Sequence, residues 1–233
     1  MLDDQVVTLR SAVSRFRSTL DGLTEDDVRA ASSLPGWTRG HVLTHVARSA
    51  DSRRRLLRAA RAGEVGRQYS DEQTRAREID DGVRRPAAVI REDTADALDR
   101  LLAAIVDFPA DRWAAPGHWL GVGQRPVRRV VPSMRRELEY HHVDLAAGYA
   151  PDDWPPDFVT EQLDELTTKF TRRPEAPAVT LRLPGTLLRI GDGGAVTVEG
   201  EPAQVLAWLS GRASGERLRT RPPGKLPAVP AMS

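Results

Sequence analysis

The sequence contains no cysteine among its 233 residues, and this absence excludes several kinds of chemistry. Disulfide bonds, thiolate metal ligands and a cysteine nucleophile all require a thiol side chain. Lysine is scarce as well, because 32 of the 34 basic residues are arginine. This bias extends over the whole chain, so it is more typical of a GC-rich genome than of one binding surface. Because the chain has no cysteine, any thiol chemistry must come from a small molecule.

Long apolar runs and a strong net charge are also missing. No apolar run approaches the ~18 residues that span a bilayer, and Met1 to Gln5 lack the basic and apolar parts of a secretory signal. We therefore expect a cytoplasmic protein with no membrane partner. The 34 basic and 33 acidic residues leave a formal charge of +1, without the basic excess that nucleic-acid binding requires. Nucleic acid is not an expected partner.

What the sequence has in abundance is helical periodicity. Apolar residues recur at three- and four-residue spacings, which predict an up-and-down run of helices. Thr24 and Thr38 are the expected N-caps of two of them. The predicted helices cover approximately residues 4–21, 24–31, 38–62, 70–80, 86–105 and 132–147. Residues 109–132 carry proline, glycine and tryptophan without periodicity, so we expect an irregular connection there.

The composition changes in the C-terminal third of the chain. Pro155 and Pro156 are expected to begin a helix that ends near residue 172. Residues 178–183, 187–190 and 195–199 predict short strands, and residues 203–210 predict a helix. The predicted class is α+β, with a helical domain over 1–150, a small α/β domain over 151–221 and a proline-rich tail over 222–233. We expect the tail to be disordered or loosely draped.

One pair of side chains in the last helix of the first domain has metal-ligand spacing. Glu137 and His141 are four residues apart, so both project from one helix face. A carboxylate and an imidazole are ordinary zinc ligands, and a third imidazole would leave a fourth position for water or substrate. His45 or His41 could supply it, and His45 lies deeper in its apolar helix. The same spacing also occurs in surface pairs without a metal.

The remaining histidines are expected to have other roles. His142 points about 100° away from His141 around the helix, so it is expected to be a surface or capping residue. His41 falls in the first turn of its helix, where it would act as a structural group or support the metal ligands from behind.

Two segments together resemble the mycothiol-dependent maleylpyruvate isomerases. They are LPGWTRGHVLTHVARSAD at residues 34–51 and RELEYHHVDL at residues 136–145. Residues 61–64, 78–81, 152–156 and 211–212 add to the resemblance, which extends over most of the chain. The resemblance implies an N-terminal DinB-like four-helix bundle and a small C-terminal α/β domain similar to sterol-carrier folds.

The resemblance also implies a site and a reaction. The zinc ligands of the family correspond to His45, Glu137 and His141, although another divalent metal is possible, and its C-terminal arginine corresponds to Arg212. The implied cofactor is mycothiol, and the implied reaction converts maleylpyruvate to fumarylpyruvate. Thiolate addition makes the double bond single, and elimination after rotation gives the trans product. Arg212 would bind a substrate carboxylate, and His41 would tune the site from behind the ligands.

Two other functions remain compatible with the sequence. A mycothiol S-transferase would use the same three ligands but would stop after addition to its electrophile. A non-catalytic protein would bind a small ligand with its C-terminal unit and use the helices as a scaffold. Under both enzyme hypotheses, the isomerase and the S-transferase, the partners are mycothiol and a small electrophile. The sequence does not predict the oligomeric state.

Overall fold

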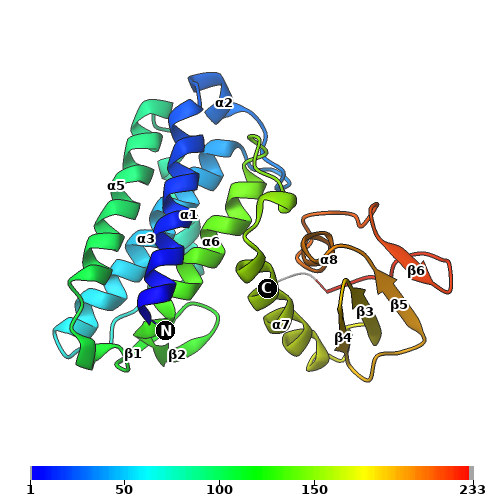
Figure 1. Ribbon diagram of the computed structural model, residues 1–233. Coiled ribbons are helices and arrows are strands. Elements are labelled where there is room, and N and C mark those ends of the chain that lie inside the picture. The colour runs from blue at the N-terminus through cyan, green and yellow to red at the C-terminus, as the bar shows by residue number, and fades with distance from the viewer. Residues whose placement is uncertain (1, 231–233) are drawn as a thin grey trace. The chain divides into compact units, whose positions relative to one another are not determined.

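The chain folds into two compact units, residues 1–148 and 149–233 (Figure 1). The computed structural model describes residues 2–230. The first unit is mainly helical, and the second combines a small sheet with helices, which confirms the mixed α+β class. None of the helices in the described range is both long and apolar enough to cross a membrane.

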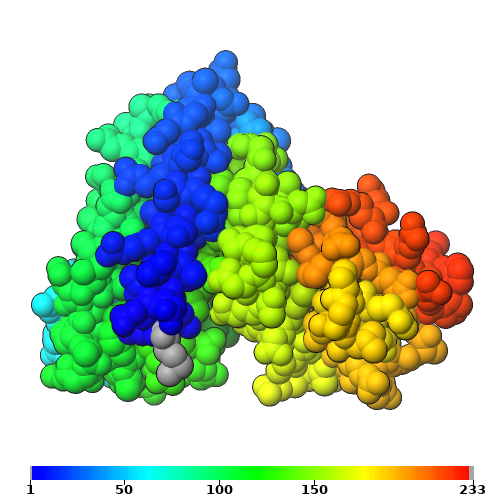
Figure 2. Space-filling view, viewed as in Figure 1, coloured from blue at the N-terminus to red at the C-terminus, as the bar shows by residue number. Residues whose placement is uncertain are grey.

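Four long helices enclose the core of the first unit. They are α1 (Leu2–Gly22), α3 (Arg39–Arg61), α5 (Ala87–Val106) and α6 (Val130–Asp144), and the shorter α2 (Glu25–Arg29) and α4 (Glu72–Gly82) lie between them in sequence. Helices α1 and α3 each pack against both α5 and α6. On the face shown in Figure 2, the side chains of α1 and α6 meet without a gap. All six predicted helices are confirmed.

Helix α1 illustrates why the apolar spacing forms this core. Leu9, Val13, Phe16 and Leu20 lie on one face, and each is at most 4% exposed. Burial of a side chain of this size contributes about 1.5–3 kcal/mol. The apolar stripe, rather than the polar outer face, therefore holds α1 in place.

The beginning of α3 is fixed by a reciprocal cap. The Thr38 hydroxyl accepts a hydrogen bond from the His41 backbone N–H, and His41 Nδ1 accepts one from the Thr38 N–H at 3.1 Å. Thr24 caps α2 through Asp27 in the same manner. Both predicted N-caps are confirmed, and the cap sets the position of His45, about two turns into α3.

The segment between α5 and α6 differs from the prediction. We expected an irregular connection, but its centre is an antiparallel hairpin of β1 (Pro116–Trp119) and β2 (Gly123–Pro126), between the 3₁₀ turns η1 (Ala110–Arg112) and η2 (Val127–Arg129). Gly121 and Gly123 have positive φ angles of 68° and 79°. The tight turn between the strands requires this left-handed backbone, which glycine adopts readily. Trp119 anchors the hairpin in the core at 8% exposure.

The second unit contains a four-stranded mixed sheet. Its elements are η3 (Pro151–Asp153), α7 (Pro156–Thr171), β3 (Val179–Leu183), β4 (Thr186–Ile190), β5 (Val196–Glu199), α8 (Pro202–Leu209) and β6 (Arg219–Arg221). The strand order is β4-β3-β5-β6, with β3 and β5 parallel and the other pairs antiparallel. Helix α7 packs against β4 and α8. The three predicted strands and both helices are confirmed.

The end of the second unit contains a strand that the sequence pattern did not indicate. Strand β6 is three residues long, two of them arginine, and it exists through pairing with β5. In the predicted tail, residues 222–230 contain no helix or strand. The Thr220 hydroxyl accepts from the Gly224 N–H at 2.8 Å and donates to its carbonyl oxygen at 3.0 Å. Residues 231–233 lie outside the described residues.

Candidate metal centre

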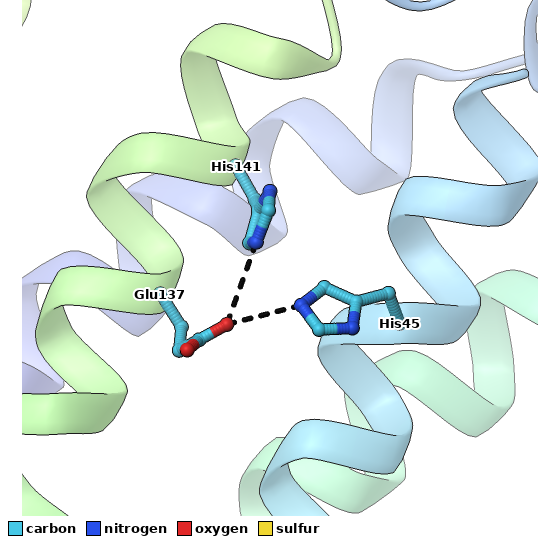
Figure 3. Close-up of side chains that lie close together, drawn as sticks. All are labelled: His45, Glu137 and His141. Atoms are coloured by element: carbon cyan, nitrogen blue, oxygen red, sulfur yellow. Dashed lines mark hydrogen bonds and ion pairs between the residues drawn. The ribbon is translucent and has the colours of Figure 1, made fainter. Parts of the chain in front are cut away.

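Three side chains from two helices of the first unit converge on one point (Figure 3). His45 comes from α3, and Glu137 and His141 come from α6. Glu137 Oε2 lies 3.0 Å from His45 Nε2 and 3.4 Å from His141 Nε2. One nitrogen or oxygen atom from each residue lies within 4.8 Å of the other two. The structure thus brings the three predicted ligands together.

The two helices are tied to each other beside this cluster. Arg39 stands at the first position of α3, and its guanidinium donates to the carbonyl oxygens of Leu145 and Ala146, each at 2.8 Å. These carbonyls follow the end of α6, where a cation is favourable. Ala146 has a positive φ of 50°, so the chain turns away there. The start of α3 is therefore fixed against the end of α6.

The three residues fit a divalent metal ion in both spacing and donor type. Tetrahedral zinc with bonds of about 2.0–2.1 Å places its ligand atoms roughly 3.3 Å apart. The separations of 3.0 and 3.4 Å between Glu137 Oε2 and the two Nε2 atoms lie close to this value. Two imidazoles and one carboxylate form the donor set of catalytic zinc sites, which keep a fourth position for water or substrate. The cluster can thus hold zinc or a similar cation.

His45 is the most buried of the three, at 5% exposure. Burial, together with the charge of His141, lowers the pKa of His45 to about 4. The ring is therefore neutral near pH 7, as a metal ligand must be. Its Nδ1 faces the guanidinium of Arg75, with Nη2 at 3.2 Å. The indole of Trp37 lies at 5.8 Å between ring centres.

Glu137 is held in its charged form by a buried arginine. Arg53 is 4% exposed, and its Nη2 lies 3.2 Å from Glu137 Oε1. Burial alone would raise the pKa of Glu137, but Arg53 and the hydrogen bonds to His141 and His45 lower it well below its usual value. Arg53 also donates to the Ser133 hydroxyl at 3.0 Å and to the Ser49 carbonyl oxygen at 3.0 Å. Oε1 is thereby occupied, and Oε2 faces the two histidines.

His141 has a carboxylate behind it. Its Nδ1–H donates to Asp144 Oδ2 at 2.9 Å, and Asp144 is fully buried. Burial opposes the charged ring, but the hydrogen bonds to Asp144 and Glu137 raise the pKa of His141. The Asp144 bond places the hydrogen on Nδ1 and leaves Nε2 as the coordinating atom, the usual arrangement behind a metal-bound histidine.

The other predicted histidines lie outside this cluster. His41 uses Nδ1 in the cap of α3, and its ring stacks on Trp37 at 5.8 Å. We expected His142 to be a surface or capping residue, but it is buried, at 3% exposure, so the surface prediction is wrong. Its Nε2 lies 2.7 Å from the Thr19 hydroxyl, and its ring packs edge-on against Phe16. It points away from His141 and joins α6 to α1.

Arg212 lies in the second unit, directly after α8. Its backbone N–H donates to the Ala207 carbonyl oxygen at 2.7 Å, and its Nη1 donates to the Ser210 carbonyl oxygen at 3.1 Å. Gly211 precedes it with a φ of 73°, the left-handed conformation that ends the helix. The role of Arg212 stays a prediction.

Comparison with known proteins identifies the family. The model of the mycothiol maleylpyruvate isomerase N-terminal domain matches residues 9–146, and the model of the corresponding C-terminal domain matches residues 153–231. The chain belongs to the mycothiol maleylpyruvate isomerase family. In this family match, the first domain contains all three residues of the cluster. No curated protein matches the sequence.

Two solved structures share the fold of this family member. One is a mycothiol-dependent maleylpyruvate isomerase, with a TM-score of 0.92 and 24% identity. The other is a histidine-to-alanine variant described by the same name, with a TM-score of 0.92 and 23% identity. Each comparison covers 100% of this chain and 97% of the solved chain. At this identity the likeness establishes the fold alone.

Proposed function

We propose that this protein is a mycothiol-dependent isomerase that converts maleylpyruvate, or a similar cis-enoyl diketo acid, to the fumaryl isomer. The observation that carries the proposal is the convergence of His45, Glu137 and His141 in a chain of this family. We also assign the first unit to the DinB-like bundles and the second to the sterol-carrier-like folds, as the resemblance implies. The expected partners are mycothiol and a small electrophile.

The proposed reaction needs no oxidant or reductant. The thiolate of mycothiol adds to one carbon of the cis double bond, and the electron pair moves onto the neighbouring carbonyl as an enolate. The former double bond is then single and rotates. The enolate electrons return, the carbon–sulfur bond breaks, and the thiolate leaves the trans product. Mycothiol is regenerated, so it acts as a cofactor.

The three clustered residues would hold zinc or another divalent cation for this reaction. When bound, the cation supplies the thiolate at neutral pH, because a coordinated thiol is deprotonated. Arg53 and Asp144 keep Glu137 and His141 aimed at the common point. The absence of cysteine from the chain ensures that no side-chain thiol competes with mycothiol.

Two further residues have proposed roles. Arg212 would donate paired hydrogen bonds to a substrate carboxylate and stabilise the charge that develops during addition. His41 would act indirectly, because its ring stacks on Trp37, which also contacts His45. It would help to fix the position of His45 at the cluster.

Product analysis tests the proposal. The zinc-loaded protein is supplied with mycothiol and maleylpyruvate, and the products are separated and identified. We expect fumarylpyruvate, with the thiol recovered in full. Accumulation of a thioether would instead identify a mycothiol S-transferase. Stoichiometric binding without turnover, retained in Glu137→Ala, would identify a non-catalytic binding protein.

A further inference from the structure

Arg75 contacts the ring of His45, and among residues 2–230 it has no acidic partner. It lies on α4 and is partly buried, and its Nη2 is 3.2 Å from His45 Nδ1. It forms no ion pair with any carboxylate of the described chain. Arg53, the other arginine at the cluster, pairs with Glu137. A partly buried arginine without a counter-ion beside a candidate metal centre requires an explanation.

The contact between Arg75 and His45 depends on which ring nitrogen carries the hydrogen. A neutral imidazole has one donor and one acceptor nitrogen. Without a metal, Nε2–H donates to Glu137 Oε2, and Nδ1 accepts from Arg75. If Nε2 serves as a metal ligand, the hydrogen must lie on Nδ1. Two donors then face each other, and Arg75 loses its acceptor.

The two histidines of the cluster differ in this respect. His141 has the carboxylate of Asp144 behind its Nδ1–H, so metal binding leaves its hydrogen bond intact. His45 has a cation in the corresponding place. The arginine is therefore available to an acceptor from outside the chain whenever the metal is bound.

We propose that Arg75 binds a carboxylate group of the substrate beside the metal centre. This inference rests on the proposed function, because it assigns a binding group for the acidic substrate of that reaction. Charge supports it, since the carboxylates in contact with the two histidines, Glu137 and Asp144, supply two negative charges, whereas a divalent cation with Arg53 and Arg75 would supply four positive ones. An anion that approaches the centre would gain from this excess, and guanidinium matches the geometry of a carboxylate.

A binding experiment tests the role of Arg75 without any turnover. Succinate carries two carboxylates and no double bond, so it does not react with thiols, and succinamide is its uncharged analogue. Calorimetry with the zinc-loaded wild-type protein should detect succinate but not succinamide. In Arg75→Gln the succinate affinity should fall about 10- to 100-fold, the range for hydrogen bonds to a charged group. Unchanged affinity would overturn the proposal.

Two controls separate substrate binding from other effects of the substitution. Arg77→Gln removes the same charge from the same helix at an exposed position, and we expect its succinate affinity to match the wild type. The zinc content of Arg75→Gln, measured by elemental analysis, should equal that of the wild type. An equal loss of succinate affinity in Arg77→Gln, or a loss of zinc from Arg75→Gln, would contradict a specific role for Arg75.

The result also remains distinct from the test of the proposed function. With maleylpyruvate and mycothiol as substrates, kcat/KM of Arg75→Gln should be lower than that of the wild type, and the larger change should be in KM. Turnover that is equal in both proteins would reject the inference and leave the isomerase proposal intact. Arg75-dependent succinate binding without any isomerisation would support the inference and reject the isomerase proposal.

Discussion

The hydrogen bond between Asp144 and His141 shows how single residues prepare the centre. Asp144 is fully buried and accepts from His141 Nδ1–H at 2.9 Å. A carboxylate in this place fixes the tautomer and raises the basicity of the coordinating nitrogen. Its backbone carbonyl oxygen also accepts from the Ser33 N–H at 2.9 Å. Asp144 thus links the ligand helix to the loop before α3.

We expect Asp144→Asn to weaken zinc binding. The amide keeps the size of the side chain but loses the negative charge, so the zinc affinity should fall about 10- to 100-fold. Competition with a chromophoric chelator measures the change. The control is Asp99→Asn, which makes the same change in an exposed pair with Arg17. Equal zinc affinity in Asp144→Asn and the wild type would contradict the role of Asp144.

The ion pair between Arg53 and Glu137 is expected to stabilise the metal-free protein. Arg53→Met leaves the partly buried carboxylate of Glu137 without its counter-charge, and the free energy of unfolding should fall by about 3 kcal/mol in urea titrations. The double variant Arg53→Met with Glu137→Leu should recover part of this loss. Arg17→Met, which breaks an exposed pair with Asp99, should cost less than about 1 kcal/mol. A similar cost for both arginines would contradict the account.

At the scale of secondary-structure elements, the start of α3 depends on Thr38. Thr38→Ala removes the acceptor for the His41 N–H and should lower the free energy of unfolding by about 1 kcal/mol. Urea unfolding followed by circular dichroism measures the change. Thr38→Ser keeps the hydroxyl and should remain within about 0.5 kcal/mol of the wild type. An alanine variant as stable as the serine variant would show that the cap does not support α3.

Most of the elements could be predicted from the sequence because their signals are local. Apolar spacing, capping threonines and Pro156 mark the helices within a few residues. The hairpin of β1 and β2 and the strand β6 lack such signals. Each of these strands has three or four residues and no alternating pattern, and each exists through pairing with another segment.

The residues of the metal centre also differ in how local their sequence signals are. The four-residue spacing of Glu137 and His141 could be recognised, and Asp144 follows His141 by three residues on the same helix. Arg53 also had a local signal, since it lies two four-residue steps after His45 on α3, but arginine is too common in this chain for the signal to stand out. No local pattern could indicate Arg75, because only the packing of α4 against α3 brings it to His45.

At the scale of the whole molecule, the core and the metal centre are expected to be independent. The buried apolar faces of four helices stabilise the first unit, whereas the metal would contact only three side chains. Removal of zinc with a chelator should therefore abolish activity and leave the helical circular dichroism signal nearly unchanged. Re-addition of zinc should restore activity. Activity in a preparation that elemental analysis shows to be metal-free would reject a role for the metal.

The central claim is that two imidazoles and one carboxylate bind a cation that accepts the sulfur of mycothiol. X-ray absorption at the zinc edge, recorded before and after addition of mycothiol, tests this claim most directly. We predict the scattering pattern of two imidazoles in the first spectrum and a new sulfur neighbour at about 2.3 Å in the second. A first spectrum without imidazole scattering, or a second spectrum without sulfur, would contradict the account.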